Sequence, residues 1–109
     1  MNLLLKCNDV DETRQFYADV LKFTTWDSAE GTVSAQLSDG TLIFSPADNL
    51  GKKPSMSGTI YFFIDDVENY FETVRDRADV QWPLQEMSYG TREFGIRDCN
   101  GYYLAFAQA

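Results

Sequence analysis

The chain has 109 residues, of which 9 are Lys or Arg and 17 are Asp or Glu, so its net charge is −8, and it contains no histidine. The 44% hydrophobic and 15% aromatic content predicts one folded domain and excludes a disordered acidic tail. The acidic balance argues against nucleic-acid binding, because phosphates need a basic face, and the lack of histidine removes the commonest general base and transition-metal ligand.

The remaining composition predicts a cytoplasmic protein. No apolar run approaches the roughly 20 residues of a membrane-spanning helix, and the apolar start of the chain is too short for a signal peptide. Cys7 and Cys99 lie far apart and have no CxxC spacing. We therefore expect two free thiols in a reducing compartment, with a disulfide or a reactive thiol as the alternative.

The first half of the chain predicts a strand, a helix and three further strands. Asp9, with Glu12 three residues later, forms the pattern of a helix N-cap. A helix over residues 10–21 follows, because its apolar side chains recur at helical spacing. Strands are predicted over residues 1–7, 23–29, 32–37 and 41–45, and the last two are joined by a hairpin at Ser38-Asp39-Gly40.

The second half repeats this order after a connector, Pro46–Gly58, which is rich in turn-forming residues. Asp66 is the predicted cap of a helix that runs from Val67 to about Ala78. The predicted strands cover residues 59–64, 80–84, 91–97 and 102–108.

Matched features indicate an internal repeat with a period of about 57 residues. A unit of about 50 residues cannot bury both faces of its sheet, so the two units must pack together. The matched pairs are Asp9-Val10-Asp11 with Asp66-Val67-Glu68, Trp26 with Trp82, and Ser38-Asp39-Gly40-Thr41 with Cys99-Asn100-Gly101-Tyr102.

A β-α-β-β-β unit used twice resembles the vicinal oxygen chelate superfamily, which includes glyoxalase I, extradiol dioxygenases, and fosfomycin- and bleomycin-resistance proteins. The resemblance rests on the segments 9–21 and 89–106, the second of which (YGTREFGIRDCNGYYLAF) looks most like the bleomycin-resistance branch. It implies an α+β fold in which two β-α-β-β-β modules form curved mixed sheets with the helices outside. The single domain would cover residues 1–109, with modules of about 1–45 and 59–109 and a linker over 46–58.

The same resemblance bears on metal binding. Catalytic members of the superfamily place His or Glu ligands at positions that correspond here to Asn2, Phe44, Thr59 and Ala105. These side chains do not form a transition-metal site, which needs several imidazole, thiolate or carboxylate ligands. The resemblance therefore implies a metal-free binding protein without cofactor or catalytic residues. The alternative is a metal-dependent lyase, isomerase or dioxygenase with atypical ligands.

The alternation of side chains along a strand, together with the positions that correspond to metal ligands, predicts which residues bind a ligand. If Thr59 and Ala105 face a cavity, so do other aromatic side chains on the same strand faces. Glu93 is the candidate partner for a ligand amine. The alternative for Glu93, as for Glu86 and Arg92, is a charge that protects a strand edge from pairing with another sheet. For the aromatic residues the alternative is packing in the core. The predicted ligand-binding residues are Trp26, Phe44, Tyr61, Phe63, Trp82, Glu93 and Tyr103.

The functional prediction is binding and sequestration of a small aromatic or cationic molecule, with a bleomycin-like antibiotic as the most specific version. An acidic protein attracts cationic ligands, and inward aromatic rings without a metal suit a flat one. The resemblance also implies a homodimer, and we expect neither nucleic acid nor membrane as a partner. The remaining alternative is a ligand-free structural or regulatory dimer, whose cavity would be closed by Phe44, Phe63 and the two tryptophans.

Overall fold

The computed structural model describes residues 1–109 and contains two successive β-α-β-β-β units, which confirms the predicted α+β fold class. Short 3-10 turns lie at Ala29–Gly31 and Asp48–Leu50. The first unit consists of β1 (Asn2–Lys6), α1 (Val10–Gln15), a π-helical turn (Phe16–Val20), β2 (Thr24–Asp27), β3 (Val33–Leu37) and β4 (Gly40–Ser45). The second unit consists of β5 (Thr59–Phe63), α2 (Val67–Val74), β6 (Asp79–Glu86), β7 (Arg92–Arg97) and β8 (Tyr103–Gln108).

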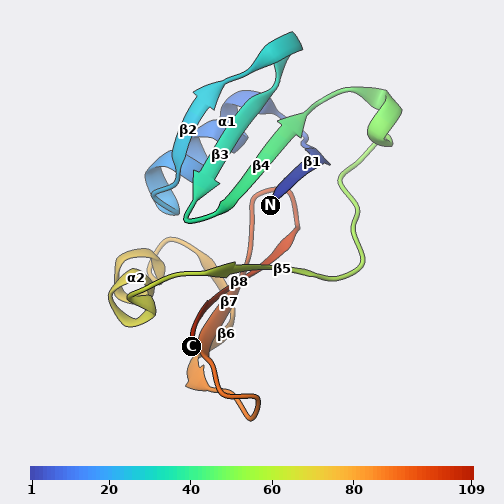
Figure 1. Ribbon diagram of the computed structural model, residues 1–109. Coiled ribbons are helices and arrows are strands. Elements are labelled where there is room, and N and C mark those ends of the chain that lie inside the picture. The colour runs from blue at the N-terminus through green and yellow to red at the C-terminus, as the bar shows by residue number, and fades with distance from the viewer.

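Each unit forms its own four-stranded mixed sheet. The strand orders are β1-β4-β3-β2 and β5-β8-β7-β6, so the fourth strand of each unit inserts beside the first. The first strand runs parallel to this neighbour, and all other pairs are antiparallel. In Figure 1 the first sheet lies above the second, and the linker joins β4 to β5 along the right-hand side.

The predicted helix caps are confirmed, but both helices are shorter than predicted. Asp9 accepts a hydrogen bond from the Glu12 N–H (2.8 Å), and Asp66 accepts one from the Asn69 N–H (3.2 Å). The first α-helix ends at Gln15 and continues as the π-helical turn, in which the Leu21 N–H donates to the Phe16 carbonyl. Lys22, with φ 61°, then ends the helical segment, because a left-handed residue cannot continue it.

The two units share one hydrophobic core, which lies on the helix-covered faces of the sheets. Ile60, Phe62, Leu104 and Phe106 of the second sheet are all buried in this common cluster. Phe23 of the first unit meets the ring of Phe62 of the second at a centroid distance of 5.2 Å. Because each sheet is covered on one side only, the other side, called its open face below, is turned away from the core.

Phe44 corrects one prediction about these faces. It was expected on the open face, but it lies in the core at 0% exposure, 5.0 Å from the ring of Tyr17. The strand register explains the error: Leu4 pairs with Ile43, so Ile43 shares the open face with Leu4. Counting one residue too far along a strand moves a side chain to the opposite face.

A polar seam joins the units beside this core. The Tyr17 hydroxyl donates to the Asp98 carboxylate, and Asp98 also accepts the N–H groups of Asn100 (2.9 Å) and Tyr102 (2.8 Å). The Tyr102 hydroxyl in turn donates to the Lys6 carbonyl at 2.7 Å. Burial raises the pKa of Asp98 above its ordinary value, and it raises the pKa of the Tyr17 hydroxyl strongly.

Both cysteines are free thiols, with Cys7 buried and Cys99 half-buried. Burial raises the pKa of Cys99 to about 12, so its thiol is protonated at neutral pH. None of the helices is both long enough and apolar enough to cross a membrane.

Candidate ligand-binding site

The open face of the second sheet carries rows of side chains that the strand register defines. One row runs across the sheet through Tyr61, Ala105, Gly95 and Trp82. The next row places Glu93 beside Ala107, which pairs with Phe63. Because the middle positions are glycine and alanine, a large neighbouring side chain can lie directly over them, as the Trp82 indole does over Gly95.

Glu93 lies fully buried in this face, and only neutral groups hydrogen-bond it. Its Oε1 accepts the Tyr89 hydroxyl at 2.7 Å and the Thr91 hydroxyl at 3.2 Å. Its Oε2 accepts the Trp82 Nε1–H at 3.2 Å and the Tyr61 hydroxyl at 3.3 Å. No salt bridge of the chain involves Glu93. A buried carboxylate without a cationic partner is costly to keep, which makes it a candidate for binding one.

The Trp82 indole lies directly on Gly95. A Cβ atom at position 95 would come within 2.2 Å of the indole carbons, so only glycine permits this contact. The close approach brings the indole N–H to Glu93, two residues away along β7. Trp82 is half-buried, so part of its ring remains available to a ligand.

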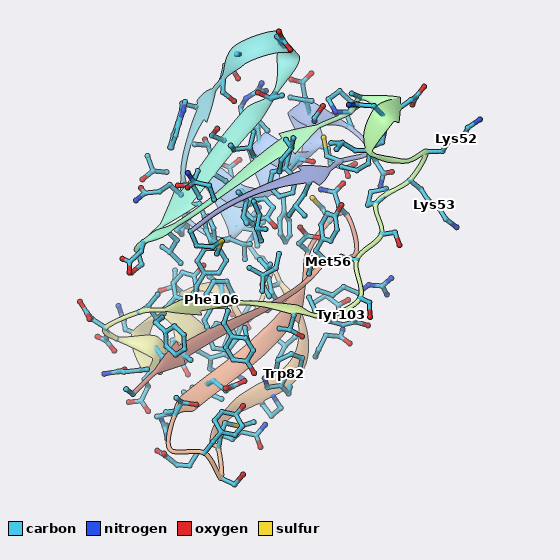
Figure 2. All side chains as sticks on the ribbon, turned by 45° about the vertical axis from the view of Figure 1, so that its right-hand side comes forward. Lys52, Lys53, Met56, Trp82, Tyr103 and Phe106 are labelled. Atoms are coloured by element: carbon cyan, nitrogen blue, oxygen red, sulfur yellow. The ribbon has the colours of Figure 1, made fainter.

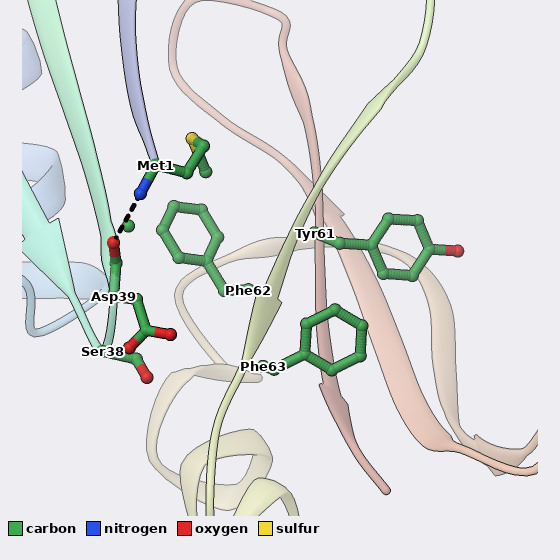
Figure 3. A pocket seen from close by; sticks show the side chains of 7 residues that line it. Met1, Ser38, Asp39, Tyr61, Phe62 and Phe63 are labelled. Carbon is green, nitrogen blue, oxygen red and sulfur yellow. Dashed lines mark hydrogen bonds between the residues drawn. The ribbon is translucent and has the colours of Figure 1, made fainter.

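Tyr61 and Phe63 form an exposed aromatic pair on β5. Their rings are stacked at 25° with a centroid distance of 6.3 Å. Figure 3 shows both rings on one side of β5, while Phe62 points to the other side, toward Met1. Phe63 is 60% exposed, although large apolar side chains are usually buried. An exposed aromatic surface next to a buried carboxylate suits a ligand that is both flat and cationic.

Tyr103 borders the same face at the other end of β8. Its ring lies 6.0 Å from the guanidinium of Arg97. Figure 2 shows Tyr103 above Trp82. The structure thus brings five of the predicted residues onto one face, called the second-sheet site below: Tyr61, Phe63, Trp82, Glu93 and Tyr103.

The other two predicted residues lie elsewhere. Phe44 belongs to the core, as described above. Trp26 lies on the open face of the first sheet, where it heads a row through Ser34, Ile43 and Leu4. This row has the same order as the row of Trp82, so the two tryptophans do occupy equivalent positions in the repeat.

Two donors of the site were missed by the sequence analysis, and one alternative that it left open is now excluded. Tyr89 and Thr91, which both donate to Glu93, were not among the predicted residues. Thr91 could have been found from its spacing, because strand alternation puts residues 91 and 93 on one face. The alternative that Glu93 is an edge charge is excluded, because β7 is an inner strand. Glu86 is exposed, Arg92 is half-buried, and the two form a salt bridge.

Lys6 does not enter the second-sheet site. It belongs to the first sheet, and its ammonium donates to the carbonyls of Pro46 and of Ala47 (3.2 Å) and lies 3.5 Å from the Asp48 carboxylate. Its donors are therefore used to hold the start of the linker, and it is not placed to act as a base on a ligand at Glu93.

The residues do not fit the metal site of catalytic relatives. The structure holds no group of three or more His, Cys, Asp or Glu side chains that could share a metal ion. Ile43, which occupies the open-face position that was predicted for Phe44, has no atom that could bind a metal either.

The closed cleft expected for a ligand-free dimer is also not formed by the predicted side chains. Phe44 is in the core, Trp26 and Trp82 belong to different sheets, and Phe63 is exposed. A small cavity of about 180 Å³ lies between the units and shares Tyr61 and Phe63 with the second-sheet site. Its lining residues are Met1, Ser38, Asp39, Gly40, Tyr61, Phe62 and Phe63. Figure 3 shows the hydrogen bond from the N-terminal ammonium to the Asp39 carbonyl at its edge (2.9 Å).

Two mixed four-stranded sheets, each built from one β-α-β-β-β unit, define the fold class of the protein. Within this class, the family model described as Glyoxalase/Bleomycin resistance protein/Dioxygenase superfamily matches residues 2–106, so the chain belongs to that superfamily. No curated protein sequence matches the chain.

Solved structures with the same fold span nearly the whole chain. TioX from Micromonospora sp. ML1 is 20% identical with a TM-score of 0.79, and the match covers 99% of this chain and 96% of that one. A superfamily member from Sphaerobacter thermophilus is 17% identical, with a TM-score of 0.79 and coverage of 99% and 94%. The hypothetical protein SA1046 from S. aureus is 18% identical, with a TM-score of 0.79 and coverage of 100% and 92%. At these identities the matches establish the fold alone.

Proposed function

We propose that the protein binds and sequesters a small aromatic or cationic molecule at the second-sheet site without a metal ion. The observation that carries this proposal is Glu93, a fully buried carboxylate that has four neutral donors and no cation. The exposed rings of Tyr61 and Phe63 beside it supply a surface for stacking.

Binding would combine two contributions. The ligand's rings stack on the aromatic side chains, each pair adding about 0.5–1.5 kcal/mol beyond the burial of area. Its positive charge is drawn to an acidic protein of net charge −8 and is neutralised at Glu93. Nothing is turned over in this mechanism, since the site contains no nucleophile with an adjacent base.

A bleomycin-like antibiotic is the most specific version of the proposal, and it derives from the likeness of residues 89–106 to the bleomycin-resistance branch. The test is a titration with metal-free bleomycin in the presence of a chelator, followed by tryptophan fluorescence. Saturable quenching that salt weakens, and that disappears in Trp82→Phe but persists in Trp26→Phe, would support it. An unchanged spectrum would remove the antibiotic from the proposal, and smaller aromatic cations would then be tested in its place.

The predicted homodimer and the cytoplasmic location remain part of the proposal. Leu4 and Phe63, on the open faces of the two sheets, are 54% and 60% exposed, and large exposed apolar side chains often mark contact surfaces. Sedimentation at micromolar concentration tests the dimer: a species of about twice the 12.4 kDa chain mass supports it, and a monomer contradicts it.

A further inference from the structure

We propose that the second-sheet site selects aromatic cations that carry N–H groups, of the amidinium or guanidinium type, over quaternary ammonium, neutral and anionic molecules of similar size. This inference rests on the proposed function and specifies the chemical class of its ligand. It follows from how the two oxygens of Glu93 are bound, from the charge of the site and from the aromatic surface around it.

The two carboxylate oxygens are held unequally. Oε1 has a short hydrogen bond from Tyr89 (2.7 Å) and a longer one from Thr91 (3.2 Å), which lies just before β7. Oε2 has only the long hydrogen bonds from Trp82 and Tyr61, at 3.2 and 3.3 Å. Because long hydrogen bonds are the weaker ones, a ligand would replace a donor at Oε2 while Oε1 stays fixed.

Tyr61 is the donor that a ligand would displace. Its ring is 40% exposed, and its hydroxyl also lies 3.4 Å from the Tyr89 hydroxyl, which is another long contact. The Trp82 indole, in contrast, is fixed by its contact with Gly95. A ligand donor that approaches between these rings therefore reaches Oε2 from the side of Tyr61.

The chemistry of Oε2 determines what the ligand must offer. A neutral donor would only exchange one weak hydrogen bond for another, whereas an N–H cation supplies both the donor and the missing positive charge. A quaternary ammonium has the charge but no N–H, so it would leave the displaced acceptor without a hydrogen bond. An anionic ligand would be repelled by Glu93.

The surrounding rings favour a planar cation. Planar guanidinium-type groups stack on aromatic faces, and the exposed parts of Trp82, Tyr61 and Phe63 offer such faces.

Four probes that share a phenyl ring test this selectivity: benzamidine, benzamide, benzyltrimethylammonium and benzoate. Each is titrated into the ¹⁵N-labelled protein, and the two indole N–H signals are followed by NMR. The Trp82 indole N–H itself binds Glu93, so its signal reports directly on Oε2, and the signal of Trp26 is an internal control on the other sheet. Trp82→Phe assigns the two signals.

We expect benzamidine to shift the Trp82 signal saturably and to bind at least about tenfold more tightly than the other three probes, which corresponds to about 1.4 kcal/mol. If benzamide or benzyltrimethylammonium binds as tightly as benzamidine at Trp82, the selectivity is wrong while the proposed binding function stands. If none of the four probes moves the Trp82 signal, both are contradicted.

A matched pair of variants separates Glu93 from the general negative charge. Glu93→Gln keeps the shape and the acceptor oxygen but removes the charge, and it should bring benzamidine to the affinity of benzamide. Glu86→Gln makes the same change of charge at an exposed side chain and should leave the tenfold preference intact. Equal losses in both variants would overturn the assignment to Glu93. The probe series on the unaltered protein remains decisive if Glu93→Gln does not fold.

Discussion

The open faces of the two sheets are built on the same plan and carry different chemistry. Trp26 and Leu4 flank Ser34 and Ile43 in the first sheet, and Trp82 and Tyr61 flank Gly95 and Ala105 at the equivalent positions of the second. Only the second face contains a buried carboxylate with no cation. The repeat therefore determines the scaffold, whereas the side chains on one face determine the site.

The charged groups of the two faces differ in what satisfies them. Lys6 on the first face is bound by carbonyls of the linker and by Asp48, which are part of the same chain. Glu93 on the second face is bound by hydroxyls and an indole, none of which carries charge. The first arrangement is complete in itself and holds the linker, whereas the second is open to a cationic ligand.

A loss of stability in Phe44→Ala, larger than in any other variant proposed here, tests which side of the first sheet is the open face. Phe44→Ala should lower the free energy of unfolding by about 3–5 kcal/mol, because it leaves a cavity in the shared core. Leu4→Ala, one strand away and 54% exposed, should lower it by less than about 1 kcal/mol. Urea unfolding measures both, and similar losses would contradict the assignment of the two faces.

Gly95→Ala should disrupt the second face alone. Its new methyl group would overlap the Trp82 indole, so we expect a loss of about 1–3 kcal/mol in stability and a displaced Trp82 N–H signal. Ser34→Ala changes the equivalent position of the first sheet without adding bulk, and serves as the control. An unchanged Trp82 signal in Gly95→Ala would show that the indole does not rest on Gly95.

The equivalence of the two tryptophans could be predicted from the sequence, whereas the face on which Phe44 lies could not. Trp26 and Trp82 were matched from sequence because each follows its helix at the same distance, and the strand registers place them in equivalent rows. The face of Phe44 was predicted wrongly because alternation gives the face only once the pairing partner is known, and the pairing of Leu5 with Phe44 is a tertiary fact.

The composition of the site was also only partly predictable. Tyr61, Phe63 and Tyr103 follow from alternation once one position on each strand is fixed. The ring of donors around Glu93 does not, because Tyr89 lies in the β6–β7 hairpin and Trp82 on a strand with register shifts. Such contacts depend on the fold of the hairpin, which local sequence patterns do not specify.

Asp98, in the seam between the units, predicts a dependence of stability on pH. Because its pKa is raised in the folded state, the folded chain holds the proton more tightly than the unfolded chain. Its contribution to stability is therefore present below the unfolded pKa of about 3.9 and is lost as the pH rises through the raised value. Asp98→Asn keeps an acceptor oxygen and should abolish this part of the dependence.

The measurement for Asp98 is urea unfolding of both proteins at a series of pH values. The difference in unfolding free energy, the original chain minus the variant, should fall as the pH rises above about 4 and then level off. A difference that stays constant, or that rises with pH, would contradict the role assigned to the buried carboxyl. Asp39→Asn, at an exposed carboxylate, controls for the general change in charge.

Replacing each tryptophan by phenylalanine should change stability little and should show which of the two responds to a ligand. Trp26→Phe and Trp82→Phe should each lower stability by less than about 2 kcal/mol, because neither ring belongs to the shared core. Only the second variant should lose the response to benzamidine, measured by fluorescence of the remaining tryptophan. Loss of the response in both variants would mean that the two faces act together.

The decisive test of the second-sheet site is a crystal structure of the protein soaked with benzamidine. We expect the amidinium within hydrogen-bonding distance of Glu93 Oε2, with the Tyr61 hydroxyl displaced and the ring against Trp82. Benzamidine bound instead beside Trp26 on the first sheet, or in the small cavity between Met1 and Phe62, would contradict the assignment of the site to the second sheet.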